Sequence, residues 1–404
     1  MPNNIKTLTF STLYPSSVRP GHGIFVETRL RELLKTGEVE TRVVAPVPWF
    51  PFSGKRFGEY GKIAATPTFE HRNGIDVFHP RYLLPPKIGM NIAPYTLARG
   101  AIPTIRKIIR DGFDFDLIDA HYFYPDGIAA WMIAKWLGKP FVVTARGTDI
   151  NLIPEFKKPR QLIQLAAHNA AASIGVCSAL VDVLRGWGID PTRLHVMRNG
   201  VDLERFRPLP KSEMRSQLGL SGFPLLISVG YLIERKGHHI VIDALAKLLP
   251  SLPNATLVLI GNGPERKSLE QRVASLGLGQ NVKFTGTVPN TDLARWYSAA
   301  DALILASSRE GWANVLLESM ACGTPVVATR IWGTPEVVAN DVAGRLVDQR
   351  DGEHFAAGIT SLIDRYPDRS AVRTYAEGFS WNATSEAQLA LFKKISAHRS
   401  AHRV

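Results

Sequence analysis

Two glutamates eight positions apart form the most informative pattern in the sequence. Glu310 and Glu318 lie in the stretch SSREGWANVLLESMACGTPVVAT, in which Gly-Trp-Ala-Asn follows the first glutamate and Cys-Gly-Thr-Pro follows the helix-like run Val315–Ala321. We therefore expect Glu310 in the loop before a helix N-terminus and Glu318 about two turns inside, on roughly the same face. A helix N-terminus favours anionic phosphate, and carboxylates accept hydrogen bonds from sugar and ribose hydroxyls. Such spacing alone is common on surfaces, but this combination predicts a nucleotide-sugar site.

A second candidate is a loop that carries two adjacent cations. The segment SVGYLIERKG (228–237) reads as a strand end, a tight turn and the start of a helix, with Arg235 and Lys236 in the turn. An Arg-Lys pair is ordinarily solvated. At the end of a buried strand, however, it could neutralise a diphosphate.

The first half of the chain offers a glycine-rich loop and two strand ends. Gly21-His22-Gly23 follows the first predicted strand and leads directly into a helix, so its backbone could approach a ligand closely. His121 ends a predicted strand, where a histidine is more often structural than catalytic. The turn Thr144–Asp149 carries Arg146, whose fork suits phosphate or carboxylate.

Together these segments resemble the E-x7-E pattern of the retaining glycosyltransferases of family 4, which have the GT-B fold. The resemblance extends through Asn199-Gly200-Val201-Asp202, GNGPER (261–266) and the end segment Phe379-Ser380-Trp381. The catalytic residues that it implies are His121, Arg235, Lys236 and Glu310. The donor-binding residues that it implies are Gly23, Gly230, Val288, Glu310, Gly311, Trp312, Ala313, Asn314, Val315, Leu316 and Glu318. The acceptor-binding residues that it implies are Gly21, His22, Arg146 and Asp149.

Three positions depart from the pattern of the family. Tyr231 stands where many relatives have an arginine, and Arg235 is the candidate to replace it. Trp312-Ala313 replaces a common Phe-Gly, which should alter the shape around the sugar. Arg146 replaces the usual histidine and suggests an anionic acceptor or an acidic sugar.

The resemblance implies transfer of a hexosyl group, with retention, from a nucleoside-diphosphate sugar to a hydroxyl of a polysaccharide or lipid-linked acceptor. A UDP-sugar is favoured and GDP-mannose is the alternative, with Lys236 and Arg235 neutralising the leaving diphosphate. Glu318 would bind the ribose and Glu310 the hexose. No Asp-x-Asp motif appears where other glycosyltransferases hold a metal, so we expect neither a divalent cation nor another cofactor.

Alternating apolar and helical segments predict two α/β domains, each with a doubly wound parallel sheet, facing across a cleft as in GT-B enzymes. The expected strands are Thr7–Phe10, Thr41–Ala45, Ile75–Phe78, Leu117–Ala120, Phe141–Thr144, Ser173–Val176, Leu225–Gly230, Ala255–Ile260, Val282–Thr285, Ala302–Leu305 and Val326–Ala328. The expected boundary lies between residues 196 and 197. Residues 1–196 would bind the acceptor and residues 197–381 the donor, with a helix over about 382–404 packing back onto the first domain.

Composition and charge indicate the cellular compartment of the protein and its expected partners. The chain has 404 residues, two cysteines and no apolar run long enough to span a membrane, which suggests a cytoplasmic enzyme with two buried thiols. Residues 1–200 carry 25 Lys and Arg against 16 Asp and Glu, so an anionic lipid surface or a phosphorylated acceptor is an expected partner. No nucleic-acid-binding motif accompanies this charge, and nucleic acid is not expected.

Aromatic and basic residues alternate over Trp49–Tyr60, in WFPFSGKRFGEY. Peripheral contact with the inner face of an anionic membrane and an acceptor-binding loop folded onto its own domain explain this segment equally well. The rival functions are a sugar-nucleotide epimerase or phosphorylase of the same architecture and, less favoured, a basic nucleic-acid- or lipid-binding protein.

Overall fold

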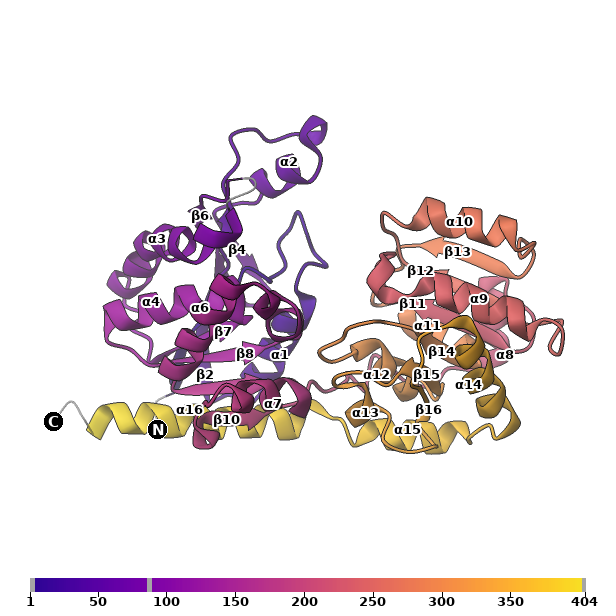
Figure 1. The fold of residues 1–404 in the computed structure, drawn as a ribbon. Coiled ribbons are helices and arrows are strands. Elements are labelled where there is room, and N and C mark those ends of the chain that lie inside the picture. The colour runs from indigo at the N-terminus through magenta and orange to yellow at the C-terminus, as the bar shows by residue number, and fades with distance from the viewer. Residues whose placement is uncertain (1–3, 86–88, 402–404) are drawn as a thin grey trace. The chain divides into compact units, whose positions relative to one another are not determined.

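The computed structural model describes residues 4–85 and 89–401, and the chain divides into two compact units (Figure 1). Unit 1 contains residues 1–198 and 382–404, and unit 2 contains residues 199–381. The chain therefore leaves unit 1 once, builds unit 2 and returns.

Unit 1 is built on a sheet whose strands are ordered β10-β9-β8-β7-β1-β2-β5-β4. The strands are β1 (Ile5–Phe10), β2 (Val39–Val44), β4 (Phe69–Arg72), β5 (Ile75–Phe78), β7 (Leu117–His121), β8 (Phe141–Ala145), β9 (Ala172–Gly175) and β10 (Leu194–Val196). All neighbours pair in parallel except β4 and β5. The central strands β7 and β8 are buried along their whole length, and apolar residues predominate in both.

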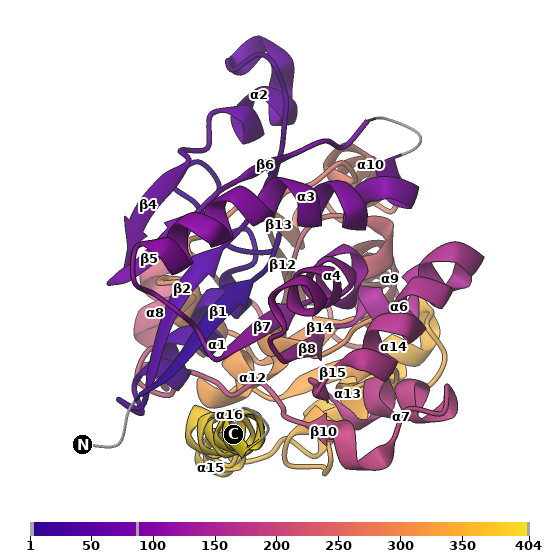
Figure 2. The ribbon, with the colours of Figure 1, turned by 90° about the vertical axis from the view of Figure 1, so that its left-hand side faces the viewer.

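Helices cover this sheet, and α3, α4 and α6 lie in front of it in Figure 2. The helices of unit 1 are α1 (Ile24–Leu34), α2 (Gly58–Ala64), α3 (Gly89–Arg110), α4 (Ile128–Leu137), α5 (Thr148–Asn151), α6 (Lys157–Asn169), α7 (Ser178–Gly186) and α16 (Trp381–Ala401). The short strands β3 (Val47–Pro48) and β6 (Arg81–Tyr82) form a separate parallel pair. Phe392 of α16 is fully buried in one cluster with Leu117 and Val142 of the sheet, so the C-terminal helix is part of the core of unit 1.

Unit 2 has a fully parallel sheet with the strand order β13-β12-β11-β14-β15-β16. Its strands are β11 (Leu225–Val229), β12 (Thr256–Ile260), β13 (Val282–Gly286), β14 (Ala302–Leu305), β15 (Val326–Thr329) and β16 (Gly344–Val347). This is the order 3-2-1-4-5-6 of a Rossmann sheet, in which the winding reverses between β11 and β14.

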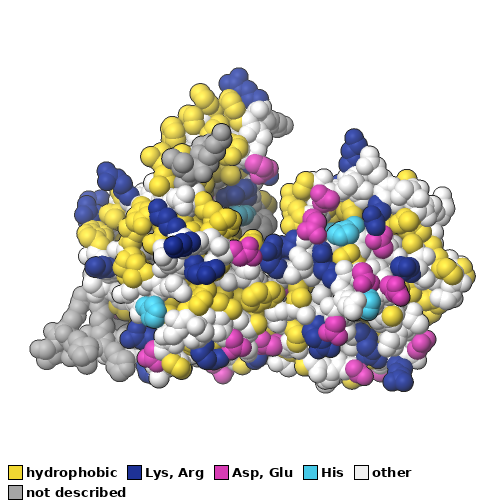
Figure 3. All heavy atoms as spheres, in the orientation of Figure 1, with side chains coloured by type: hydrophobic (Ala, Val, Ile, Leu, Met, Phe, Trp, Pro, Cys, Tyr) yellow, Lys and Arg dark blue, Asp and Glu magenta, His cyan; other side chains and the backbone are white. Residues whose placement is uncertain are grey.

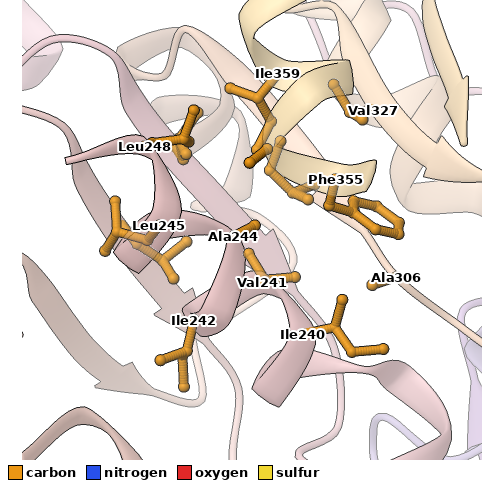
Figure 4. Close-up of a cluster of buried hydrophobic side chains, with 14 of the residues drawn as sticks. Ile240, Val241, Ile242, Ala244, Leu245, Leu248, Ala306, Val327, Phe355 and Ile359 are labelled. Atoms are coloured by element: carbon orange, nitrogen blue, oxygen red, sulfur yellow. The ribbon is translucent and has the colours of Figure 1, made fainter. Parts of the chain in front are cut away.

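The helices of unit 2 are α8 (Lys211–Leu218), α9 (His238–Leu248), α10 (Arg266–Ser275), α11 (Leu293–Ala299), α12 (Asn314–Ala321), α13 (Thr334–Val337), α14 (Gly352–Asp364) and α15 (Arg369–Glu377). Figure 4 shows side chains of α9, Val241 and Leu248 among them, gathered with Phe355 and Ile359 of α14 in one buried cluster. The expectation of two Rossmann-like α/β domains is confirmed. Their assignment to donor and acceptor remains a prediction.

Candidate active site

The candidate site of unit 2 lies where the winding of its sheet reverses. Ligands of open α/β sheets bind beyond the carboxyl ends of the strands at such a point. Gly230 follows β11 there, and the segment Ala306–Ala313 follows β14. The loop after β11 contains a 3₁₀ turn (Glu234–Lys236) and ends at Gly237, whose φ of 70° and close approach to Ala306 exclude a side chain.

Lys236 and Glu310 meet at this point of the sheet. The Lys236 Nζ donates a hydrogen bond to the Glu310 Oε1 at 2.6 Å, and the Ser307 Oγ donates to the same oxygen at 2.7 Å. Glu310 is only 9% exposed, and the Lys236 side chain is 17% exposed. The two residues that sequence analysis placed in different roles therefore form an ion pair.

Arg235 is less firmly placed than its neighbour. Its Nη1 donates to the backbone carbonyl of Arg309 at 2.6 Å and lies 3.8 Å from the Glu310 Oε2. Its side chain is 30% exposed. Tyr231, at the position where relatives often carry an arginine, is exposed.

The segment after Glu310 leads into α12. Gly311, Trp312 and Ala313 are buried, and Asn314, the first residue of the helix, accepts a hydrogen bond from the Asn199 side chain at 3.2 Å. Val315 is half-buried and Leu316 is fully buried in the first turn of the helix. The α12 amides thus begin next to Glu310, as the sequence predicted.

The Trp312 ring packs within unit 2. Its centroid lies 6.2 Å from that of Phe379, which contacts Tyr375. The Trp312 Nε1 has no hydrogen-bond partner among the described residues. Trp312 therefore fixes the Glu310 loop against the segment that follows α15.

Glu318 has a partner different from that of Glu310. The Tyr297 hydroxyl of α11 donates to its Oε2 at 2.9 Å. Dense packing raises the pKa of Glu318 to about 7, although the Tyr297 hydrogen bond and the charge of Arg205 oppose this shift. Val288 lies half-buried in the loop after β13.

A separate candidate site lies at the corresponding reversal in unit 1, between β1 and β7. The loop after β1 contains exposed Gly21, half-buried His22 and buried Gly23. Gly23 adopts a φ of 66°, and a Cβ there would lie 2.3 Å from the Leu13 backbone. The His22 ring contacts the Thr12 carbonyl at 3.1 Å, and burial lowers its pKa.

His121, at the end of β7, is enclosed by protein. It is 1% exposed, its Nδ1 accepts from the Arg146 Nη2 at 2.6 Å, and its Nε2 lies 3.3 Å from the Asp119 Oδ2. Burial lowers the pKa of His121 more than Asp119 raises it, so the neutral ring with its proton on Nε2 is favoured. Arg146, which is half-buried, lies closer to solvent than the histidine that it contacts.

Burial lowers the pKa of Arg146 to about 9, so the guanidinium remains charged at neutral pH. Asp149 fixes the turn that carries it, because its carboxylate accepts from the amides of Gly147 and Phe123 at 2.8 Å and of Arg146 at 3.0 Å. Asp149 is thus fully used by backbone amides. Its expected contact with an acceptor remains a prediction.

Several residues that contact the predicted ones were not predicted from the sequence. Ser307 holds Glu310, and Tyr297 holds Glu318. In unit 1, Gln388 of α16 accepts from Arg29 at 2.8 Å and donates to Asp119 at 3.2 Å. Ser307, three residues before Glu310, was visible in the motif, whereas the links from Tyr297 and Gln388 arise only from the fold.

Other features bear on cofactors and cavities. In the part of the chain that the structure describes, no three His, Cys, Asp or Glu side chains are grouped to hold a metal ion. Independence of metal remains a prediction.

No helix among these residues is long and apolar enough to cross a bilayer. Cys177 and Cys322 are buried thiols, as expected. Two open cavities of about 620 and 450 Å³ lie in unit 1, away from the predicted site residues.

Comparison with solved structures places the fold among glycosyltransferases. A sucrose-phosphate synthase from Thermosynechococcus elongatus superposes with a TM-score of 0.77 at 20% identity, covering 98% of this chain and 100% of that one. HepE of Anabaena, solved in complex with UDP, gives a TM-score of 0.71 at 22% identity, covering 97% and 100%. At these identities the likeness establishes the fold.

Sequence comparison establishes the family. Residues 210–379 match the family described as glycosyl transferases group 1, and residues 21–205 match glycosyltransferase family 4. TuaC of Bacillus subtilis, assigned as a teichuronic acid biosynthesis glycosyltransferase, is 32% identical over 363 residues, 88% of each chain. A D-inositol 3-phosphate glycosyltransferase of Frankia alni is 32% identical over 305 residues, 69% of this chain and 74% of the other. The chain belongs to the group 1, family 4 glycosyltransferases and is a glycosyltransferase with the two Rossmann-like domains of the GT-B fold.

Proposed function

We propose that this glycosyltransferase moves a hexosyl group from a UDP-sugar, with retention of configuration, to a hydroxyl of a polysaccharide or lipid-linked acceptor. The observation that carries the proposal is the Lys236–Glu310 pair at the switch point of unit 2. A cation, a carboxylate and the first amides of α12 gather where a Rossmann sheet binds its ligand.

Lys236 is proposed to neutralise the charge that develops on the leaving diphosphate, with Arg235 in support. The acceptor hydroxyl attacks the anomeric carbon on the face that the diphosphate leaves. The C1–O bond to phosphate breaks, the glycosidic bond forms, and the hydroxyl proton passes to a phosphate oxygen. The products are the nucleoside diphosphate and the glycoside.

Glu310 acts in this scheme as the residue that orients Lys236 and binds hexose hydroxyls. Its Oε1 already accepts from Lys236 and Ser307, so the sugar would be held mainly by the Oε2. Glu318 would accept from the ribose hydroxyls in place of, or together with, the Tyr297 hydroxyl. Trp312 would determine the position of the Glu310 loop.

The proposed donor nucleotide is UDP. HepE of Anabaena, which shares the fold, was solved with UDP, with UDP and glucose, and with UDP-glucose. GDP-mannose is the alternative. Unit 1 is proposed to bind the acceptor, with Arg146 recognising an anionic group on it, and the name of TuaC supports an acceptor of the cell envelope. We place the reaction at the cytoplasmic face of the membrane.

The proposal is tested by incubating the full chain with UDP- and GDP-sugars and candidate envelope saccharides. We expect UDP release that depends on acceptor, and a product whose anomeric configuration by NMR matches that of the donor. Conversion of the donor without acceptor would favour the epimerase, and release that requires inorganic phosphate would favour the phosphorylase. Inversion would refute the retaining mechanism.

A further inference from the structure

The surface of unit 1 formed by α3, α4 and α6 carries charge of one sign. These helices contain four, one and three Lys or Arg residues respectively, and no Asp or Glu. All eight cations are exposed. They are Arg99, Arg106, Lys107, Arg110, Lys135, Lys157, Lys158 and Arg160. The nearest acidic residues in sequence stand beyond the helix ends, at Asp111, Asp114 and Glu155, and Asp111 pairs with Lys107 at 2.5 Å.

This charge distribution differs from that of other helices in the protein. The α1 helix of the same unit contains Glu27 and Glu32 beside its arginines, and α10 of unit 2 contains Glu270 beside Arg266 and Arg272. On α3, α4 and α6, by contrast, no acidic residue of the same helix balances the cations. It makes this surface complementary to a polyanion.

The same three helices expose large apolar side chains. Trp136 and Tyr95 are each 44% exposed, and Leu165 is 41% exposed. They line an open groove of about 450 Å³ with Trp131, Met132 and Leu162. Figure 3 shows Lys and Arg side chains lying among hydrophobic ones on unit 1.

Cations and aromatic rings are interleaved on this surface. The Arg106 guanidinium lies 4.7 Å from the Trp136 ring centroid, and the Lys135 ammonium lies 6.0 Å from that of Trp131. Aromatic rings favour the headgroup level of a bilayer, and lysine and arginine near them are attracted to anionic lipid. Helices α3 and α4, like α4 and α6, contact each other, so they present one continuous surface.

We propose that the face formed by α3, α4 and α6 docks unit 1 on an anionic phospholipid bilayer. The cations contact headgroup phosphates, and Tyr95, Trp136 and Leu165 enter the interface. The proposed transfer reaction does not use this surface. Because vesicle binding is measured without a sugar donor, a failure of membrane docking can be distinguished from a failure of the proposed reaction.

The face is distinct from the aromatic segment Trp49–Tyr60. In that segment the Phe50 ring packs against Phe52, Phe57 and Tyr60 with centroids 5.4–6.2 Å apart. Its rings therefore pack mainly on one another, although Trp49, Phe52 and Tyr60 remain exposed. This segment serves as the competing anchor in the test.

The experiment is co-sedimentation of the full chain with vesicles of phosphatidylcholine alone or with half phosphatidylglycerol, at 50 and 300 mM salt. We expect binding that needs phosphatidylglycerol and weakens with salt. The triple variant R99Q/R106Q/K135Q should bind about 100-fold more weakly, at about fivefold per cation. Y95S/W136S should also weaken binding, without changing its salt dependence.

The matched control removes three exposed lysines from unit 2, in K247Q/K267Q/K283Q. Both triple variants lose three positive charges. An equal loss of vesicle binding in the two would therefore show a nonspecific charge effect and overturn the proposal. Loss in W49S/F52S but not in the face variants would assign docking to the other segment. Preference for a double-stranded DNA oligonucleotide over vesicles would make the face a nucleic-acid surface. Thermal unfolding of every variant verifies that it folds.

Discussion

Replacing Lys236 with methionine should lower kcat by about 10²–10³-fold, or about 3–4 kcal/mol of transition-state stabilisation. Methionine keeps much of the length and apolar surface of the lysine stem and removes its charge. Lys236 ends 2.6 Å from Glu310, so its ammonium is fixed before a ligand binds. Arg235 makes a weaker contact with the same carboxylate, at 3.8 Å, and cannot replace a cation so placed.

The same change should lower the free energy of unfolding of unit 2 by about 1–3 kcal/mol. Glu310 loses one of its two short hydrogen bonds and keeps Ser307. The cost stays below that of breaking a fully buried ion pair, because Lys236 is partly exposed and Arg235 is near. For a unit of this size the melting temperature should fall by about 2–4 °C per kcal/mol.

A double-mutant cycle with Glu310→Gln separates the two effects. The neutral double variant K236M/E310Q should regain most of the stability, because no carboxylate is left without its cation, but should recover no activity. Lys267→Met, an exposed lysine of α10, is the matched control and should leave both quantities unchanged. Steady-state kinetics with the accepted donor and calorimetry supply the measurements. A K236M variant within fivefold of the parent in kcat would refute the reasoning.

The remaining predictions concern the neighbouring residues. Glu318→Gln should raise the free energy of unfolding by about 1–3 kcal/mol more at pH 8 than at pH 4.5. The folded pKa near 7 lies above the unfolded value, so ionisation costs stability as pH rises between them; an equal effect at both pH values in urea titrations would contradict this. Gly23→Ala should lower that free energy by at least about 2 kcal/mol, whereas Gly21→Ala, with open space around its Cα, should be neutral. Equal effects in thermal melts would count against the role of the turn. Arg146→His should raise KM at least about tenfold for an anionic acceptor and little for a neutral one. An equal rise in KM for both acceptors would exclude recognition of an anionic group by Arg146. EDTA should leave turnover unchanged, and loss restored by Mg²⁺ would disprove metal independence.

Several strands were predictable because the side chains that they bury are apolar and form short runs in the sequence. Ile75–Phe78 and Ala302–Leu305 agree with the expected ranges, and β7 extends one residue beyond its prediction, to include His121. Helix α6 was not predicted, since its KKPRQL beginning is polar and only tertiary packing buries Ile163. The antiparallel edge strand β4 (FEHR) was missed for a related reason, because it is mostly exposed and lacks an apolar run.

The candidate site was predictable in its residues but not in its contacts. Glu310 and Glu318 were recognised as a pair, yet one bonds to Lys236 and the other to Tyr297. The environment of His121 could not be read fully from its strand-end position, because Arg146 reaches it only after β7 and β8 pair. Sequence order indicates which loops share one end of a sheet, whereas hydrogen-bond partners depend on the register of the strands.

The return of α16 to unit 1 has a consequence for biosynthesis. Gln388 bridges Arg29 and Asp119, and Phe392 fills the core beside Leu117, so the amino-terminal domain lacks part of its interior until the last helix leaves the ribosome. Unit 2 is continuous in sequence and contains its whole sheet. On a ribosome, the domain translated second therefore completes its fold first.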